Sequence, residues 1–135
     1  MTLDRMIDLG WVPNKVVEVC WRWKAQRLRL ANHLGLLAMV VPDRQHLAVL
    51  WNHDAQGHDA TLYVVEGDNR RLTQVPSEVL INGNVEAVTY CWFEHSEHES
   101  LSAFTCVCTR RRDQAMYQVE IDAGSATILS VRPSR

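Results

Sequence analysis

Glycine and proline are scarce in this 135-residue chain, which contains six glycines and four prolines. Their low content excludes collagen-like and low-complexity chains, because those classes are rich in both residues. The chain also lacks any apolar run near the roughly 18 residues that a membrane span needs. With 47% hydrophobic and 22% charged residues, the sequence predicts one globular domain over residues 1–135, with a core that needs no metal or disulfide cross-links.

Paired cysteines of the kind that bind zinc or exchange disulfides are absent as well. The four cysteines form no C-x-x-C motif, and Cys106 and Cys108 lie two apart on one strand face, where a disulfide between them is awkward. We therefore expect buried free thiols, as in a reducing compartment. The N-terminus carries Asp4 and Asp8 where a signal peptide has a basic start and an apolar stretch. These features predict a cytoplasmic protein.

No motif in the sequence identifies a reaction. There is no G-x-S-x-G turn, no glycine-rich phosphate loop, and no cysteine with a recognisable catalytic flank near a histidine. A pair of carboxylates or a Ser-His-Asp arrangement has no fixed spacing and stays open. The absent motifs favour a protein that is not an enzyme and needs no cofactor. The alternative is a small metal-dependent or other hydrolase that uses the loops with His53, His58, His95 and His98.

Short apolar runs of strand length, separated by turn residues, dominate the chain after Leu36. The runs cover residues 36–41, 46–51, 61–66, 71–75, 85–93, 101–109, 115–121 and 126–131. Their close spacing predicts sequential antiparallel neighbours, that is, a meander. Residues 36–41 are apolar on both faces and predict a central strand covered on both sides, by an N-terminal helix or a second sheet layer. Residues 115–121 alternate cleanly and predict one solvent-exposed face.

The first ten residues predict a short amphipathic helix. Thr2 is a suitable N-cap, apolar residues recur at helical spacing, and Gly10 follows the last of them. Residues 15–34 fit either a helix or a hairpin. Their β-branched and aromatic residues favour a strand through Trp23, a turn near residues 24–26 and a second strand at Leu28 and Leu30.

The predicted fold class is therefore α+β and mainly β. It consists of an antiparallel β-meander sheet with a short N-terminal helix packed on it.

Histidines and acidic residues concentrate in two connections between predicted strands. "NHDAQGHDA" contains His53, Asp54, His58 and Asp59, and "FEHSEHES" contains Glu94, His95, Glu97, His98 and Glu99. Zinc binds histidine and carboxylate ligands, and the two loops would have to lie at the same end of the sheet to share one ion. The H-E-x-x-H motif is absent, the inverted H-x-x-E-H motif misses by one residue, and both need a helix. We expect no metal site, and the four histidines are weak candidates for one.

The charges are distributed unevenly along the chain. Residues 51–100 carry nine acidic and two basic side chains, whereas residues 1–50 carry seven basic and four acidic ones. An acidic middle segment steers basic partners toward itself. Small cytoplasmic immunity proteins and antitoxins often present carboxylates to basic, nucleic-acid-cleaving toxins. The sequence therefore predicts a binding protein of this type, which neutralises a toxin, for example a nuclease, through an acidic surface.

The predicted partner-binding residues are the carboxylates of the two loops and one neighbouring aromatic side chain. They are Asp54, Asp59, Trp92, Glu94, Glu97 and Glu99. Trp92 is proposed as an anchor, because tryptophan is enriched among residues that dominate binding energy. The alternative is that these charges only keep two hairpin tips soluble.

A second alternative is a nucleic-acid-binding or regulatory module that uses the basic stretch "WRWKAQRLRL". Arg22, Lys24, Arg27 and Arg29 interleave with two tryptophans in this stretch. Alternation predicts the tryptophans in the core and the cations in solvent, so the aromatics would be unavailable for base stacking. The sequence pI near 6.3 is also unlike that of a nucleic-acid-binding domain.

Overall fold

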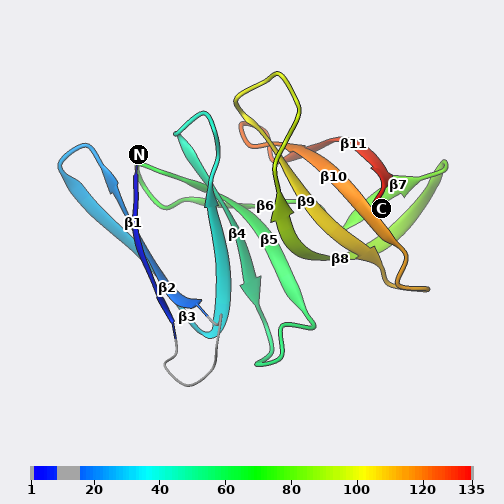
Figure 1. Cartoon of the computed structure of the whole chain (residues 1–135), viewed down its shortest axis with the longest axis horizontal. Helices are drawn as coiled ribbons and strands as arrows, with labels where there is room; N and C mark the ends of the chain where they lie inside the picture. Colours follow the sequence, from blue (N-terminus) through cyan, green and yellow to red (C-terminus); the bar gives the residue numbers. More distant parts are fainter. Residues whose placement is uncertain (1, 9–15, 135) are drawn as a thin grey trace.

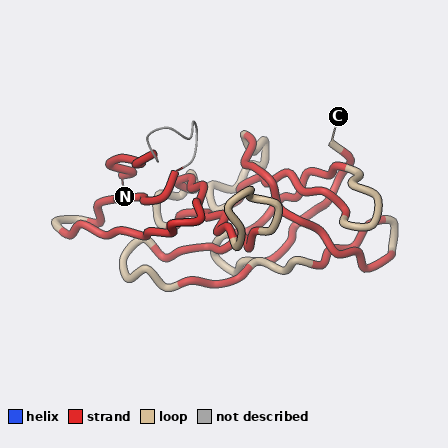
Figure 2. Tube along the Cα trace, turned by 90° about the horizontal axis from the view of Figure 1, so that it is seen from below, coloured by secondary structure: helices blue, strands red, loops and turns tan. Residues whose placement is uncertain are grey.

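The structure is a computed structural model that describes residues 2–8 and 16–134. Strands and the turns between them make up this part of the chain, without a helix (Figure 2). The strands are β1 (Thr2–Asp8), β2 (Val16–Trp23), β3 (Gln26–Val40), β4 (His46–Asn52), β5 (Ala60–Glu66), β6 (Leu72–Gln74), β7 (Glu78–Ile81), β8 (Asn84–Glu94), β9 (Ala103–Arg110), β10 (Met116–Asp122) and β11 (Thr127–Pro133). The described chain accordingly contains no helix that could cross a membrane.

The strands form two antiparallel sheets, each from consecutive strands (Figure 1). The first sheet has the order β1-β2-β3-β4-β5-β6, and the second has the order β11-β10-β9-β8-β7. Consecutive strands therefore pair with each other everywhere except between β6 and β7, where the chain passes from one sheet to the other, and this confirms the predicted antiparallel meander. The strands are divided between two packed sheets, whereas the sequence predicted one sheet covered by a helix.

The predicted N-terminal helix is wrong, because residues 2–8 form strand β1. This strand pairs antiparallel with β2, with Thr2 opposite Arg22 and Met6 opposite Val19. Pairing with an existing strand edge satisfies the backbone groups of β1, and tertiary context of this kind overrides weak local helix signals. The expected helix end at Gly10 lies outside the described residues.

The hairpin predicted between residues 15 and 34 is confirmed for the residues that the structure describes. Strand β2 ends at Trp23, and β3 begins at Gln26 after a two-residue turn. Trp21 is fully buried, whereas Arg22 and Lys24 are exposed. The alternation of apolar and basic residues thus places the tryptophan inward and the cations outward, as the sequence predicted.

Strand β3 is long because it belongs to two parts of a strongly bent sheet. Its pairing with β2 jumps from Val16 opposite Leu36 to Glu18 opposite Ala31. The extra residues form a bulge in which Gly35 has a φ of 104°, a value that L side chains rarely adopt. Asn32 is buried there and donates Nδ2 hydrogen bonds to the Gly35 and Asn52 carbonyl oxygens, each at 2.9 Å. The side chain of Asn32 thus fixes the bend.

This bend turns the β2–β3 hairpin over one face of the remaining first sheet. A cluster of buried side chains lies between the hairpin and strands β4 and β5, and it includes Trp21, Leu28, Leu47 and Val65. The opposite face packs on the second sheet through a larger cluster. That cluster includes Val41, Ala48, Leu50, Leu62, Val64, Val88, Phe104, Cys106, Val119 and Ile121. Residues 36–41 are therefore covered on both sides, by the second sheet and by the hairpin, except at Leu37, which is 37% exposed.

The second sheet presents an outward face that the core does not use. On β10, Val119 and Ile121 point into the core while Met116 is exposed, which confirms the predicted alternation. Glu120 departs from it, because only 6% of this residue is exposed. The reason is the connection between β8 and β9, which folds over this part of the sheet.

Candidate functional site

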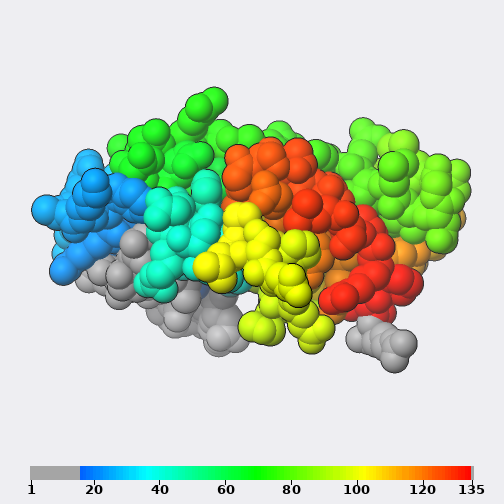
Figure 3. Space-filling view, turned by 90° about the horizontal axis from the view of Figure 1, so that it is seen from above, coloured from blue at the N-terminus to red at the C-terminus, as the bar shows by residue number. Residues whose placement is uncertain are grey.

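The two acidic loops lie at opposite ends of the strands (Figure 1). The β4–β5 loop, residues 53–59, lies beside the β9–β10 turn, because the Asp59 carboxylate meets Arg111 at 3.3 Å. The β8–β9 loop, residues 95–102, lies beside the β10–β11 turn, where Ser102 Oγ donates to Asp122 Oδ1 at 2.7 Å. Figure 3 shows the β8–β9 loop in yellow against the orange and red atoms of β10 and β11. The six predicted binding residues therefore do not form one site.

Carboxylates near the β4–β5 loop are neutralised or used within the chain. Arg110 donates to both oxygens of Asp113, at 2.9 and 2.6 Å, and this pairing lowers the pKa of Asp113 to about 2. Glu86 accepts from Arg112 at 2.8 Å. Asp54 Oδ1 accepts the backbone N–H of His58 at 2.9 Å, which closes its own loop. Of the predicted residues, Asp54 and Asp59 thus have local structural roles.

Carboxylates near the β8–β9 loop form no ion pair with the side chains that the structure describes. None of the ion pairs formed by side chains of residues 16–134 includes Glu94, Glu97, Glu99 or Glu120. Glu97 and Glu99 are exposed on the loop. The negative charge at this end is therefore available to a basic partner, in contrast to the charge at the other end.

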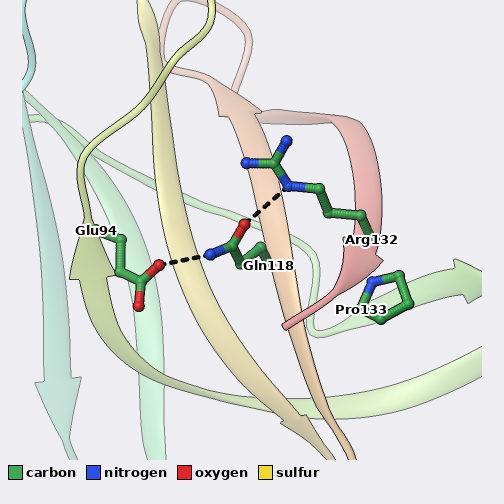
Figure 4. A pocket seen from close by; sticks show the side chains of 4 residues that line it. All are labelled: Glu94, Gln118, Arg132 and Pro133. Carbon is green, nitrogen blue, oxygen red and sulfur yellow. Dashed lines mark hydrogen bonds between the residues drawn. The ribbon is translucent and has the colours of Figure 1, made fainter. Parts of the chain in front are cut away.

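A row of hydrogen-bonded polar side chains crosses the outward face of the second sheet. Trp92 Nε1 donates to Glu94 Oε1 at 3.2 Å, and Gln118 Nε2 donates to Glu94 Oε2 at 2.6 Å. Arg132 Nε then donates to Gln118 Oε1 at 2.8 Å (Figure 4). We call these four residues the polar row. Glu94, Gln118, Arg132 and Pro133 line a surface hollow of about 460 Å³.

The local strand geometry explains why these side chains share one face. A register shift between Tyr90 and Trp92 lets Tyr90 stay in the core while Trp92 and Glu94 point outward. On β10, Tyr117 and Val119 point toward the core, so Gln118 between them points outward. Gln118 and Arg132 are direct cross-strand partners. Trp92 is 41% exposed at one end of the row, as an aromatic anchor requires.

The β8–β9 loop is tied to this face through a buried carboxylate. Glu120 accepts hydrogen bonds from Ser96 Oγ at 2.9 Å and from Thr105 Oγ1 at 2.8 Å. Ser96 Oγ also accepts the backbone N–H of His98 at 3.2 Å. The loop that carries Glu97 and Glu99 is therefore held against the sheet by specific bonds. We call the polar row together with Glu97 and Glu99 the acidic face.

The structure separates the histidines that were weak candidates for a metal site. His53 and His58 lie in the β4–β5 loop and His95 and His98 in the β8–β9 loop, at opposite ends. Among the side chains of residues 16–134, no three His, Cys, Asp or Glu residues lie where they could hold a metal ion together. His53 Nε2 is instead 2.6 Å from Thr61 Oγ1.

The basic hairpin offers cations without stacking aromatics. Arg22, Lys24, Arg27 and Arg29 are all exposed. Trp21 is fully buried, and Trp23 packs against the core cluster beneath the hairpin. This arrangement lacks the exposed aromatic platform on which single-stranded nucleic acids stack.

Of the residues predicted from the sequence, Trp92 and Glu94 are hydrogen-bonded to each other, and Glu97 and Glu99 lie on the loop that follows β8. Gln118, Glu120 and Arg132 were not predicted, and they join this surface from β10 and β11. The alternation in residues 115–121 was a partial signal, because it put Gln118 and Glu120 on the outward face. No pattern in the sequence indicated that Arg132 lies beside them.

No family model and no curated protein matches the sequence. A chain of a solved structure described as "Structure of Tne2 in complex with Tni2" is 54% identical to this one. The match covers 100% of this chain and 88% of that chain, with a TM-score of 0.88. That relative is therefore part of a complex with another protein. At this identity and coverage, the chain belongs to the same family as its counterpart in the Tne2–Tni2 complex.

Proposed function

We propose that this chain is an immunity-type inhibitor, which binds a protein toxin and blocks its action. The observation that carries the proposal is that a relative 54% identical over the whole chain is found in a two-protein complex. Binding to a protein partner is accordingly the role that this relationship most directly supports. The toxin identity of the partner rests on the charge of the acidic face and on the prevalence of such inhibitors among small binding domains.

The acidic face is the proposed binding surface. Its carboxylates form no ion pair with a side chain of residues 16–134, so their field attracts a basic partner and raises the rate of encounter. Trp92 supplies exposed aromatic area beside them, and buried aromatic anchors dominate many interfaces. Hydrogen bonds already hold the row and the loop in place, which lowers the entropy lost on binding.

We also propose that the chain acts in the cytoplasm and without catalysis of its own. All four cysteines are free, and three of them are buried, which suits a reducing compartment. The polar row contains no nucleophile beside a general base. An inhibitor that acts by binding needs only a surface complementary to its partner. Blocking a partner by binding requires no cofactor.

The proposal is tested by binding and growth measurements with Tne2 and Tni2 as probes. Each is expressed alone and together with this chain, and each purified protein is titrated against the chain by calorimetry. We expect the chain to bind one of them at one to one, and we expect that protein to arrest growth only when this chain is absent. A third arm uses the protein encoded beside the gene for this chain.

Two outcomes would contradict the inhibitor role. Growth arrest by this chain alone would assign it the toxic role in the pair. Binding to a protein that has no effect on growth would leave a binding protein that is not an inhibitor.

A further inference from the structure

The polar row contains one negative and one positive side chain that do not touch each other. Glu94 and Arg132 are joined only through Gln118, by bonds of 2.6 and 2.8 Å. No ion pair formed within residues 16–134 includes either of them. Both charges are therefore held by neutral groups and keep their capacity to attract an opposite charge from outside.

The row has a fixed polarity. An ionised glutamate only accepts hydrogen bonds and a guanidinium only donates them, so the Gln118 amide has one consistent orientation. Its NH₂ group faces Glu94 and its oxygen faces Arg132. Because Arg132 uses Nε for this bond, its two Nη groups point away from Gln118 (Figure 4). Those groups form a donor fork that matches a carboxylate.

Arg132 is a positive side chain on a surface whose other charged residues are negative. Glu94, Glu97 and Glu99 make this end of the molecule attractive to cations, and Arg132 opposes that attraction. A partner surface that was uniformly basic would be repelled by Arg132 and would bind better without it. A partner that places a carboxylate opposite Arg132 would instead use it to fix the register of the complex.

We propose that the polar row is the specificity-determining element of the acidic face. It recognises a protein surface that is basic overall, with a cationic side chain opposite Glu94 and a carboxylate opposite the Arg132 fork. The hollow lined by Glu94, Gln118, Arg132 and Pro133 receives these side chains. This inference rests on the proposed function, because it concerns the same surface and the same partner.

The direction in which one substitution changes the binding affinity tests the inference. Arg132→Gln removes a positive charge from an acidic face, so attraction to a uniformly basic partner would rise. The proposed pairing predicts the opposite, a loss of affinity of at least about tenfold, because a desolvated carboxylate of the partner would be left unpaired. Arg132→Lys keeps the charge but loses the fork, and we expect an intermediate loss.

The experiment measures the dissociation constants of the wild-type chain and its variants with whichever of Tne2 and Tni2 the wild-type chain binds. Arg71→Gln is the matched control, since it makes the same charge change on the exposed loop between β5 and β6. Thermal unfolding confirms that each variant is folded. The inference is supported if Arg132→Gln weakens binding at least tenfold and Arg71→Gln leaves it unchanged.

The failures of the two proposals are distinguishable. If the wild-type chain binds and Arg132→Gln binds equally well or more tightly, the inference is wrong and the proposed function stands. If the wild-type chain binds neither probe nor the protein encoded beside its gene, the proposed function is wrong and the inference fails with it.

Discussion

The indole Nε1 of Trp21 donates a hydrogen bond to the carbonyl oxygen of Gly67 at 2.8 Å, between residues 46 positions apart. Trp21 belongs to β2, and Gly67 follows directly after β5. The bond therefore connects the β2–β3 hairpin to the end of β5, in the part of the sheet over which the hairpin folds. Both groups are buried, so neither has water as a substitute partner.

Replacing Trp21 with phenylalanine should lower the free energy of unfolding by about 1–3 kcal/mol. The ring still fills much of the space, but the Gly67 carbonyl oxygen loses its donor inside the core. Urea unfolding followed by circular dichroism measures the change. Trp92→Phe is the control, since Trp92 is 41% exposed, and we expect its effect to stay within about 0.5 kcal/mol. Equal effects of the two substitutions would contradict the role of this bond.

Asp113 should make the stability of the protein depend on pH in an acidic window. Its hydrogen bonds with Arg110 lower its pKa from 3.8 to about 2 in the folded state. A lowered folded-state pKa contributes stability that is complete above the unfolded-state pKa and is lost as the pH falls toward the folded-state pKa. The stability difference between the wild-type chain and Asp113→Asn should therefore be constant above about pH 5 and shrink toward about pH 2.

Unfolding by urea at several pH values measures that difference, and titration of the side-chain carboxyl by nuclear magnetic resonance measures the pKa directly. A carboxyl of Asp113 that titrates at its ordinary value of 3.8 would contradict the prediction.

The buried thiols should resist modification while the protein is folded. Burial raises the pKa of Cys108 to about 12 and that of Cys106 well above its usual range, and the reactive species is the thiolate. At neutral pH, an aromatic disulfide reagent should label Cys106 and Cys108 only after unfolding. Half-buried Cys91, whose pKa burial also raises, should be the first of these three to react.

Mass spectrometry of peptides from folded and urea-unfolded samples identifies the labelled positions. Cys91→Ser is the control that separates its signal from the others. Rapid labelling of Cys106 or Cys108 in the folded protein would show that the space between the sheets is open to the reagent.

Neutralising Glu97 and Glu99 should slow association with the partner. Both carboxylates are exposed, so they act mainly through long-range attraction that salt screens. We expect Glu97→Gln/Glu99→Gln to lower the association rate several-fold at low salt, with little effect on dissociation. Surface plasmon resonance with the bound member of the Tne2–Tni2 pair, at two salt concentrations, measures both rates.

Glu78→Gln is the control for that experiment, because it removes an exposed carboxylate from β7, where Glu78 lies opposite Ala87, near the end of β8 that is remote from Glu97 and Glu99. An association rate that is unchanged at low salt would place the binding surface elsewhere.

Most strands could be predicted because their alternation is a local property of the sequence. Residues 115–121 show this well, since Val119 and Ile121 face the core as expected. Strand β7 was missed, although Asn82-Gly83 after it is a strong hairpin signal. Only four residues, Glu78–Ile81, form this strand, which is too few for alternation to stand out.

The return of the hairpin over its own sheet could not be predicted. It depends on Gly35 and on the side-chain hydrogen bonds of Asn32. In the sequence, an asparagine and a glycine indicate an ordinary turn as readily as a bend within a long strand. The error at residues 2–8 has a similar cause. Their apolar spacing fits a helix, but the free edge of β2 offers backbone pairing that only the folded chain provides.

Part of the proposed binding surface was predictable for a geometric reason. Trp92 and Glu94 are hydrogen-bonded neighbours on β8, and Glu97 and Glu99 lie on the loop that follows this strand. Gln118 and Arg132 join them through strand pairing, which depends on register. Asp54 lies at the other end because β4 and β8 point in opposite directions (Figure 1). The sequence alone does not fix the relative orientation of strands in two sheets.

Each sheet is made from one uninterrupted half of the chain, and the passage between them occurs once, between Gln74 and Glu78. The larger buried cluster, however, draws its side chains from both halves. A polypeptide cut near this passage would yield two pieces, each with an intact set of neighbouring strands and one uncovered apolar face. Two such fragments are suited to reassemble when mixed, so this protein is a natural starting point for a split reporter.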